Sequence, residues 1–327
     1  MNNLSPLRIS VKSKTLESAL NAYFGFGDPE GFQPLSSYSG LFPNLTTLHV
    51  HFTFVHFERW TCDVFRVAPA LRKLTITGIH DIVGDRTFPW AQITGYASKD
   101  DEELQGWNGP DNSVYFRILP NLKNAETVGL DCMLLEDLLP MTPPTQLLTL
   151  SRPHTLTLHV AHVNSEGEEV GTVDQLLDWL ILPLLRTPKL PEGVHDIHSL
   201  AQLLDRFLCS LQELHLVNAP LCDDQFGTLF GGNALRGPHK LDFGLFRSGS
   251  SCSVNDNVLR SLRVVPGEDV HLPQLESLAL RSSKQWSDSV LVETITSRRN
   301  VGTAGVNVSR LNQFTLVNAI PNNAEAI

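Results

Sequence analysis

Histidine residues at short spacing are the first candidates for chemistry in this sequence. His49 and His51 are two residues apart, which places them on one face of a strand, and His56 follows closely. Such a pair can ligate zinc, but no neighbouring cysteine and no HExxH sequence supplies the remaining ligands. We therefore interpret the three as histidines of a half-exposed strand and expect no bound metal.

An acid–base pair is the second candidate. Asp174 and Asp178 are four residues apart and would share one face of a helix. A helix cap and a surface carboxylate explain them better than general acid–base catalysis does. The sequence also lacks a P-loop, a GxGxxG fingerprint and a GxSxG nucleophile elbow. We therefore predict no catalytic residues, no cofactor and no enzymatic activity.

Charge and cysteine content narrow the choice of partner and compartment. The 327 residues include 35 acidic and 25 basic side chains, and the resulting net charge of -10 repels the phosphate backbone of nucleic acids. The five cysteines form no CxxC pair, and sparse cysteines are typical of a reducing compartment. No stretch reaches the roughly 20 apolar residues of a membrane span. We expect a cytoplasmic or nuclear protein that binds neither nucleic acid nor membrane.

A repeated phrase is the strongest pattern in the chain. It consists of L-x-x-L-x-L, usually opened by a proline. In L-x-L both leucines point to the same side of a strand, because strand side chains alternate between the two faces. The clear copies are FPNLTTLHV (42–50), APALRKLTI (68–76), CSLQELHL (209–216), LPQLESLAL (272–280) and VSRLNQFTL (308–316).

Degenerate copies of the phrase lie between the clear ones. Their spacing is loose: Leu45 and Leu71 are 26 residues apart, whereas Leu275 and Leu311 are 36 apart. Leu71 and Leu122 are separated by 51 residues, so one copy between them is either hidden or replaced by a loop. The degenerate copies are LPNLKNAETVGL (119–130), RPHTLTLHV (152–160), LPLLRTPKL (182–190) and GPHKLDFGL (237–245).

The segments between phrases have helical spacing of apolar residues. We predict one helix over residues 199–208, one over residues 175–185 behind an Asp174 cap, and one that follows Asp288. We interpret Arg298 and Arg299 as the solvated end of that last helix. Alternating strands and helices predict an α/β fold, an irregular leucine-rich-repeat solenoid with a concave parallel sheet and helices on the convex side. The alternative is a generic α/β domain.

Composition divides the chain into unequal parts. We assign residues 1–40 to an N-terminal lead-in or capping segment, 41–320 to the repeat domain and 321–327 to a frayed tail. Residues 84–112 are polar and rich in turn formers, which predicts an inserted surface loop. The alternative for this loop is a contact surface with Trp90 or Trp107 as its aromatic anchor.

Several segments resemble the repeat region of fungal F-box/leucine-rich-repeat proteins, a divergent group of mushroom-type fungi. The resemblance covers about residues 40 to 320 and rests on the order of the segments FPNLTTLHVHF (42–52), FPWAQITGYA (88–97), LLDWLILPLLRTPKL (176–190) and LPQLESLALRSSKQWSDSVLVETITSRR (272–299). It implies that the repeats recognise a protein substrate for a ubiquitin ligase. In that family an F-box precedes the repeats and binds the adaptor subunit of the ligase. Nothing in residues 1–40 resembles an F-box. We therefore expect the ligase adaptor subunit as a partner only if an F-box lies upstream.

The function that these patterns favour is binding to a protein partner whose identity the sequence does not give. The alternatives are a standalone repeat scaffold unrelated to ubiquitination, or a truncated product of an F-box protein gene. Positions between the repeat leucines alternate with buried positions, so they are the candidates for contact with the partner. These candidates are Thr47, His49, Lys73, Thr75, Glu213, His215, Ser277 and Ala279.

Overall fold

The fold is known from a computed structural model of the whole chain. The residues that it describes are 8–10, 42–51, 68–77, 88–99, 115, 117–132, 147–160, 177, 179–190, 200–204, 211–217, 226–227, 229–230, 233–245, 255–282, 286–301 and 307–318. They belong to two compact units. The first unit holds residues 1–153 and 160–171, and the second holds residues 154–159 and 172–327.

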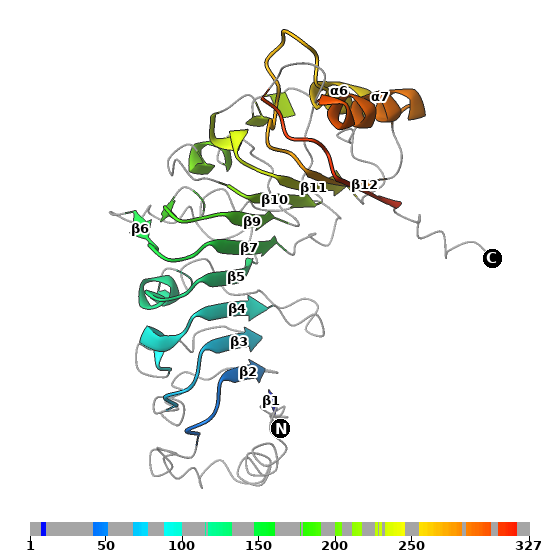
Figure 1. Ribbon diagram of the computed structural model, residues 1–327. Coiled ribbons are helices and arrows are strands. Elements are labelled where there is room, and N and C mark those ends of the chain that lie inside the picture. The colour runs from blue at the N-terminus through cyan, green and yellow to red at the C-terminus, as the bar shows by residue number, and fades with distance from the viewer. Residues whose placement is uncertain are drawn as a thin grey trace, which may run out of the picture. The chain divides into compact units, whose positions relative to one another are not determined.

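The first unit is built on a sheet whose strands follow one another in chain order (Figure 1). The first two strands pair antiparallel, and every later pair in this unit is parallel. The strands are β1 (Arg8–Ser10), β2 (Thr47–His51), β3 (Lys73–Thr77), β4 (Gly95–Lys99) and β5 (Thr127–Cys132), and the short strand β6 (Leu148–Thr149) lies in a separate small sheet.

The second unit repeats this construction with parallel strands only, again in chain order (Figure 1). Its strands are β7 (Thr155–Val160), β9 (Thr187–Leu190), β10 (Glu213–Val217), β11 (Lys240–Leu245), β12 (Ser277–Ser282) and β13 (Gln313–Asn318), beside the two-residue strand β8 (Leu180–Ile181). The prediction of an α/β repeat fold with a large parallel sheet is confirmed.

The proline that opens the phrase forms a turn. In the first copy the N–H of Leu45 donates to the carbonyl of Phe42 across Pro43, with an N–O distance of 3.3 Å. Proline suits the second position of such a turn because its ring presets the required φ. The same bond recurs in the pairs Leu71–Ala68, Leu122–Leu119, Leu185–Leu182 and Leu275–Leu272. The turn brings the first leucine of the phrase into the core just before the strand starts.

A second backbone contact joins neighbouring repeats within each unit. The carbonyl oxygen of Thr46 accepts hydrogen bonds from both Arg72 and Lys73, at 2.9 and 3.0 Å. The same double acceptance occurs at the carbonyls of Arg72, Thr94, His154, Arg186, Gln212, His239 and Glu276. These carbonyls form a ladder at the points where strands begin, which sets the register of the parallel pairs that follow.

The core includes the residues that the L-x-x-L-x-L pattern predicted to be buried. Leu48 and Val50 of β2 are 0% exposed, and Leu278 and Leu280 of β12 are 1% and 0% exposed. Pro188 takes the place of the middle leucine in β9 and is also buried. Stacked repeats bury these rows together, because a single repeat has no second layer to cover its apolar face.

The hidden copy between Leu71 and Leu122 is present. A 3₁₀ turn, η3 (Trp90–Gln92), places Ile93 at the position of the phrase leucine, and β4 follows it. The predicted loop over 84–112 is therefore wrong for residues 88–99, while residues 84–87 and 100–112, which include Trp107, lie outside the described part. Trp90 is 5% exposed and packs edge-on against Phe88, so it is a core residue and not a contact anchor.

The helical predictions are confirmed only in part. Helix α7 (Asp288–Arg299) lies where a helix was predicted after Asp288, and residues 200–204 of the helix predicted over 199–208 are helical. The predicted helix from Gln175 does not extend to Leu185: Leu180–Ile181 is the strand β8, and Leu182 to Leu185 form a phrase turn. Pro183 occupies the second position of that turn, and proline favours this position over a helix interior. Asp174 and Asp178 lie outside the described residues.

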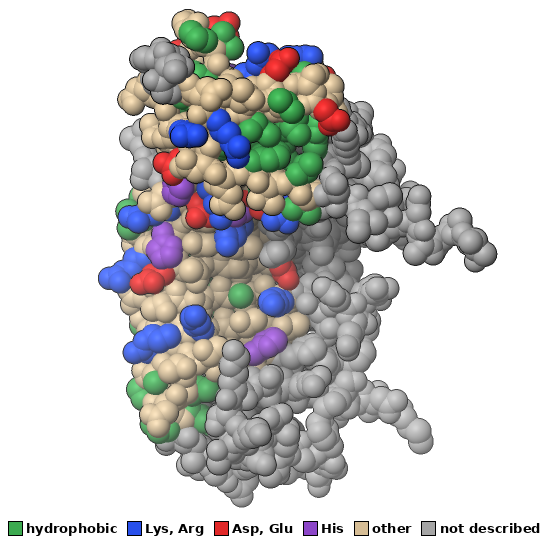
Figure 2. Space-filling view, turned by 45° about the vertical axis from the view of Figure 1, so that its right-hand side comes forward, with side chains coloured by type: hydrophobic (Ala, Val, Ile, Leu, Met, Phe, Trp, Pro, Cys, Tyr) green, Lys and Arg blue, Asp and Glu red, His purple; other side chains and the backbone are tan. Residues whose placement is uncertain are grey.

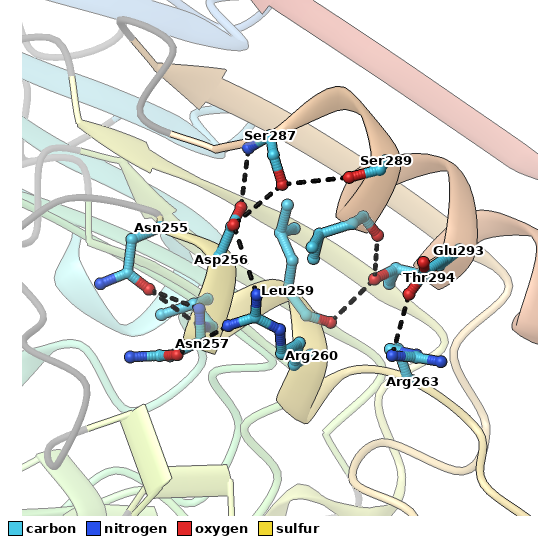
Figure 3. A network of polar contacts seen from close by, with 12 residues as sticks. Asn255, Asp256, Asn257, Leu259, Arg260, Arg263, Ser287, Ser289, Glu293 and Thr294 are labelled. Carbon is cyan, nitrogen blue, oxygen red and sulfur yellow. Dashed lines mark hydrogen bonds and ion pairs between the residues drawn. The ribbon is translucent and has the colours of Figure 1, made fainter.

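Helices α6 (Asp256–Ser261) and α7 are joined by polar contacts (Figure 3). The Asp256 carboxylate of α6 accepts hydrogen bonds from the backbone N–H and the hydroxyl of Ser287, at 2.7 and 2.8 Å, where α7 begins. The buried hydroxyl of Thr294 donates to the carbonyl of Leu259 at 3.0 Å. Arg263 pairs with Glu293 at 3.0 Å. Asp256 and Leu259 of α6 are therefore bonded to α7, and Arg263, which follows α6, adds an ion pair to α7.

The interpretation of Arg298 as a solvated helix end is wrong. Arg299 is exposed, but Arg298 is 0% exposed, and its guanidinium donates to the carbonyls of Leu262, His271 and Leu272. The three carbonyls belong to the chain between α6 and β12. A charged side chain is buried there because the carbonyls replace the hydrogen bonds that water would make.

Candidate functional site

The candidate contact positions occupy the side of the strands opposite the leucine core. Lys73 is exposed and the other seven are half-buried, and each alternates with a buried residue. The register of the sheets aligns them in rows across the strands. In the first unit Thr47 lies beside Lys73 and His49 beside Thr75, and in the second unit Glu213 and His215 lie on β10 while Ser277 and Ala279 lie on β12.

The exposed strand face of the first unit carries the charged residues Lys73, Lys99 and Asp131, each on a different strand. Beyond Lys73 and Thr75, the rows continue into Gly95 and Ala97 of β4. His49 contacts the hydroxyl of Thr77 through Nε2 at 2.8 Å. Among the described residues there is no group of three or more His, Cys, Asp or Glu side chains placed to hold a metal ion, and His56 lies outside them.

The exposed face of the second unit holds a connected group of charged side chains. We call it the charged cluster, and it consists of Glu213 and His215 on β10, Lys240 and Asp242 on β11, and Arg281 on β12. Register explains the grouping: Glu213 lies beside Lys240 and His215 beside Asp242. Neighbouring strands in a sheet are about 5 Å apart, which is within reach of these side chains.

Asp242 is the centre of the cluster. Its carboxylate accepts two hydrogen bonds from Arg281, one from Nε at 2.6 Å and one from Nη2 at 2.8 Å. This two-point pairing fixes the orientation of both groups. The Asp242 side chain is only 8% exposed, although it belongs to the outer face, because its neighbours cover it.

His215 connects Asp242 to Glu213. Its Nδ1 lies 3.3 Å from Oδ2 of Asp242, and its Nε2 lies 3.0 Å from Oε2 of Glu213. Neutral imidazole has one N–H donor, so both contacts are hydrogen bonds only when the ring carries two protons. Lys240 contributes a second cation, with Nζ 3.1 Å from the same Glu213 oxygen.

The surroundings change the pKa values of both carboxylates. Burial alone would raise the pKa of Asp242. The hydrogen bonds from His215 and Arg281 together outweigh this effect, so the pKa of Asp242 lies below its ordinary value. Glu213 follows the same balance, with burial opposed by His215 and Lys240, and its pKa is also lowered. Both groups are therefore ionised at neutral pH.

Sequence reasoning identified Glu213 and His215 but missed Lys240, Asp242 and Arg281. A usable signal existed for two of these three. In KLDFGL, Lys240 and Asp242 alternate with Leu241 and Phe243, the same pattern that selected the other candidates. Arg281 lies beyond the last leucine of its phrase, where the pattern gives no reason to select it.

No family model matches the chain, and no curated protein matches it either. None of the helices in the described residues has the length and apolar character that crossing a membrane requires. Figure 2 shows basic, acidic and histidine side chains intermixed on the described surface. The chemistry of the site therefore has to be argued from its own geometry.

The charged cluster presents paired charges in fixed positions on its strand face. Its two acids are ionised and each is paired with a cation, Asp242 with Arg281 and Glu213 with Lys240. Ion pairs that hold one another on a rigid sheet present fixed charges to an approaching molecule. Such an arrangement favours recognition, because little side-chain freedom remains to be lost on binding.

Proposed function

We propose that this chain is a non-catalytic protein–protein interaction module that binds its partner on the exposed strand face of the second unit. The observation that carries the proposal is the charged cluster, which spans three neighbouring strands. A sheet surface with positive and negative groups in fixed positions selects a partner by charge complementarity. The partner is a protein, because the net charge of -10 opposes binding of nucleic acid.

The wider role follows from the resemblance to fungal F-box/leucine-rich-repeat proteins. On that basis we propose that the repeats recognise a substrate for a ubiquitin ligase in the cytoplasm or nucleus. Their recruitment to the ligase requires an F-box, so this part of the proposal depends on coding sequence upstream of Met1. Mapping the 5′ end of the transcript tests it without affecting the proposal about the binding face.

The binding face is tested with a charge reversal that leaves the cluster intact. Lys189 is exposed on β9 and lies beside His215 in the register, so Lys189→Glu changes the surface charge without removing a cluster residue. Arg299→Glu is the matched control, because Arg299 is exposed at the end of α7 and makes the same change of charge elsewhere. Both variants should keep the wild-type circular dichroism spectrum.

The readout is quantitative mass spectrometry of proteins captured by the tagged chain. We expect at least one protein that wild type and Arg299→Glu capture equally and that Lys189→Glu captures about tenfold less, the size of effect that a charge at the edge of an interface produces. Equal capture by both variants would remove the strand face as the binding site. Turnover of a substrate by the purified chain would overturn the non-catalytic assignment.

A further inference from the structure

The sheet of the second unit ends in a strand with an open edge. Strand β13 pairs with β12 along all six of its residues, from Gln313 beside Ser277 to Asn318 beside Ser282. Within the described part of the chain, no strand pairs with the other edge of β13. A strand edge of this kind presents N–H and C=O groups with which another strand can pair.

The apolar row of the core continues onto this last strand without being covered there. Phe314 and Leu316 lie beside Leu278 and Leu280, which are 1% and 0% exposed. Leu316 is 42% exposed, and Phe314 is half-buried.

The edge also lacks the features that keep exposed strands apart. Proteins protect open edges with lysine, proline, bulges or inward-facing charges. The β13 sequence QFTLVN contains no charged residue and no proline. It is rich in the β-branched and aromatic residues that favour strand pairing.

We propose that β13 pairs antiparallel with β13 of a second copy of this chain. The twofold axis that relates the copies passes midway between the two Thr315 residues, so Thr315 lies opposite its own copy. Residues directly opposite in an antiparallel pair lie on the same face, so the axis must lie at a residue and not between two consecutive residues of one strand. With Thr315 at the axis, Phe314 of each copy lies opposite Leu316 of the other. The two apolar edges then cover each other, and the sheet continues from one copy into the next.

The register explains why the occupant is a second copy. An axis one residue further on, at Leu316, would place Phe314 opposite the polar Asn318. Only the Thr315 register puts the two large apolar residues of the strand opposite each other, twice in one interface. Such self-complementarity is what a twofold interface between identical chains requires.

A self-opposed cysteine tests the register directly. Thr315 is exposed and would lie opposite itself, at the Cβ separation of about 5 Å found between facing residues of paired strands. We expect Thr315→Cys to form a covalent dimer under mild oxidation, above the background of the wild-type chain with its five native cysteines. Gln313→Cys is the matched control, because its opposite residue is Val317. It should cross-link only when Val317→Cys is also present.

The outcomes separate this proposal from its alternatives. Equal cross-linking by Thr315→Cys and Gln313→Cys would indicate unspecific contact and overturn the register. No cross-link in the full chain, but one after removal of residues 319–327, would identify that segment as the occupant of the edge and overturn the proposal of a second copy.

A charge at the edge tests the association itself. We expect light scattering to show the wild-type mass rising from 36.3 kDa toward twice that value with concentration. Leu316→Lys should keep the monomer mass, because lysine on an open edge opposes pairing. Val292→Lys is the control: Val292 is 59% exposed on α7, and this variant should associate like wild type. A wild-type mass that stays at 36.3 kDa up to about 100 µM would overturn the proposal.

Discussion

Arg298 is a buried positive charge in the second unit, and its guanidinium donates hydrogen bonds to three backbone carbonyl groups. Burial lowers the pKa of its guanidinium to about 10, which still leaves it protonated at neutral pH. Its three carbonyl partners include Leu272, whose φ of 50° is in the left-handed region that leucine rarely adopts. The hydrogen bonds therefore stabilise a backbone conformation that the local sequence disfavours.

We expect Arg298→Met to destabilise the protein by about 3–5 kcal/mol, because three buried carbonyl groups lose their donors. Urea unfolding followed by circular dichroism measures the change in the free energy of unfolding. Arg299→Met is the control and should stay within about 0.5 kcal/mol of wild type, because Arg299 is exposed. Equal effects of the two variants would show that the buried contacts contribute nothing.

Gly244 of β11 provides a second test at the residue scale. A Cβ atom added there would lie 1.6 Å from the carbonyl oxygen of Arg281, so β12 could not keep its place beside β11. We expect Gly244→Ala to cost about 3 kcal/mol, measured by thermal unfolding. Gly129→Ala is the matched strand variant, because its nearest neighbour would lie at an ordinary 3.5 Å. A Gly244→Ala protein as stable as Gly129→Ala would contradict the packing described for β11 and β12.

The burial of an individual residue was predictable from the sequence where the alternation of the strand alone decides it. Leu48 and Leu278 are buried as the alternation predicts. Arg298 was not predictable, because an arginine near the end of a helix is usually solvated. Its burial depends on the path of residues 262–272, which come from a different repeat and which no local rule brings to α7.

At the scale of elements, the turn and the strand behave as one unit. The turn across the proline fixes the first leucine, and the following L-x-L buries two more side chains on the same face. We expect Leu278→Asp to cost about 4 kcal/mol, because it places an unpaired charge in the stack beside Leu241 and Phe314. Urea unfolding measures it.

Ala279→Asp is the matched control for that substitution. Ala279 is the next residue of the same strand but lies on the exposed face, so an aspartate there stays in contact with water. We expect its free energy of unfolding to change by less than about 1 kcal/mol. If the two aspartates were equally disruptive, the assignment of faces in β12 would be wrong.

Elements were predictable to the extent that leucine marks them. Every clear and degenerate phrase contains or precedes a strand of the structure. Strand β4 was missed because Gly95-Tyr-Ala-Ser-Lys carries no leucine, and its core positions are filled by Tyr96 and Ser98. The helix expected up to Leu185 was wrong because Pro183 forms a turn there. In both cases the turn before the strand was the better signal.

At the scale of the whole molecule, the charged cluster couples stability to pH. An acid whose pKa is lowered in the folded state contributes stability above its ordinary pKa, and this contribution is lost as the pH falls through the folded pKa. Asp242 and Glu213 both have lowered pKa values. The ordinary values are about 4, so the loss begins near pH 5 and continues as the pH falls through the lowered values.

We therefore expect the melting temperature of wild type to fall between about pH 5 and pH 3 more steeply than that of Asp242→Asn. Asparagine cannot ionise, so this variant lacks the part of the pH dependence that Asp242 supplies. It should be less stable than wild type at pH 7, because Arg281 and His215 lose a charged partner. Parallel melting curves for the two proteins across this range would contradict the role given to Asp242.

The function of the molecule was less accessible to sequence reasoning than its fold. The alternation of strand residues predicted which side chains point outward, and the structure places all eight candidates there. It could not show that Arg281 reaches back to Asp242, because that contact joins strands 39 residues apart in sequence. The charged cluster became visible only when the register of the three strands was known.

The carbonyl ladder has a consequence for how such a molecule can change over time. Successive rungs are separated by very different lengths of chain, 22 residues from Arg72 to Thr94 and 37 from His239 to Glu276. Each rung is made by main-chain atoms alone, so it does not depend on the identity of the side chains. It also tolerates a connecting segment of any length that brings the chain back to the next strand. Repeats can therefore lengthen, shorten or diverge in sequence while the spacing of the exposed face is preserved. The outward-facing residues of one repeat can therefore be substituted without disturbing the main-chain contacts that hold the strands in register.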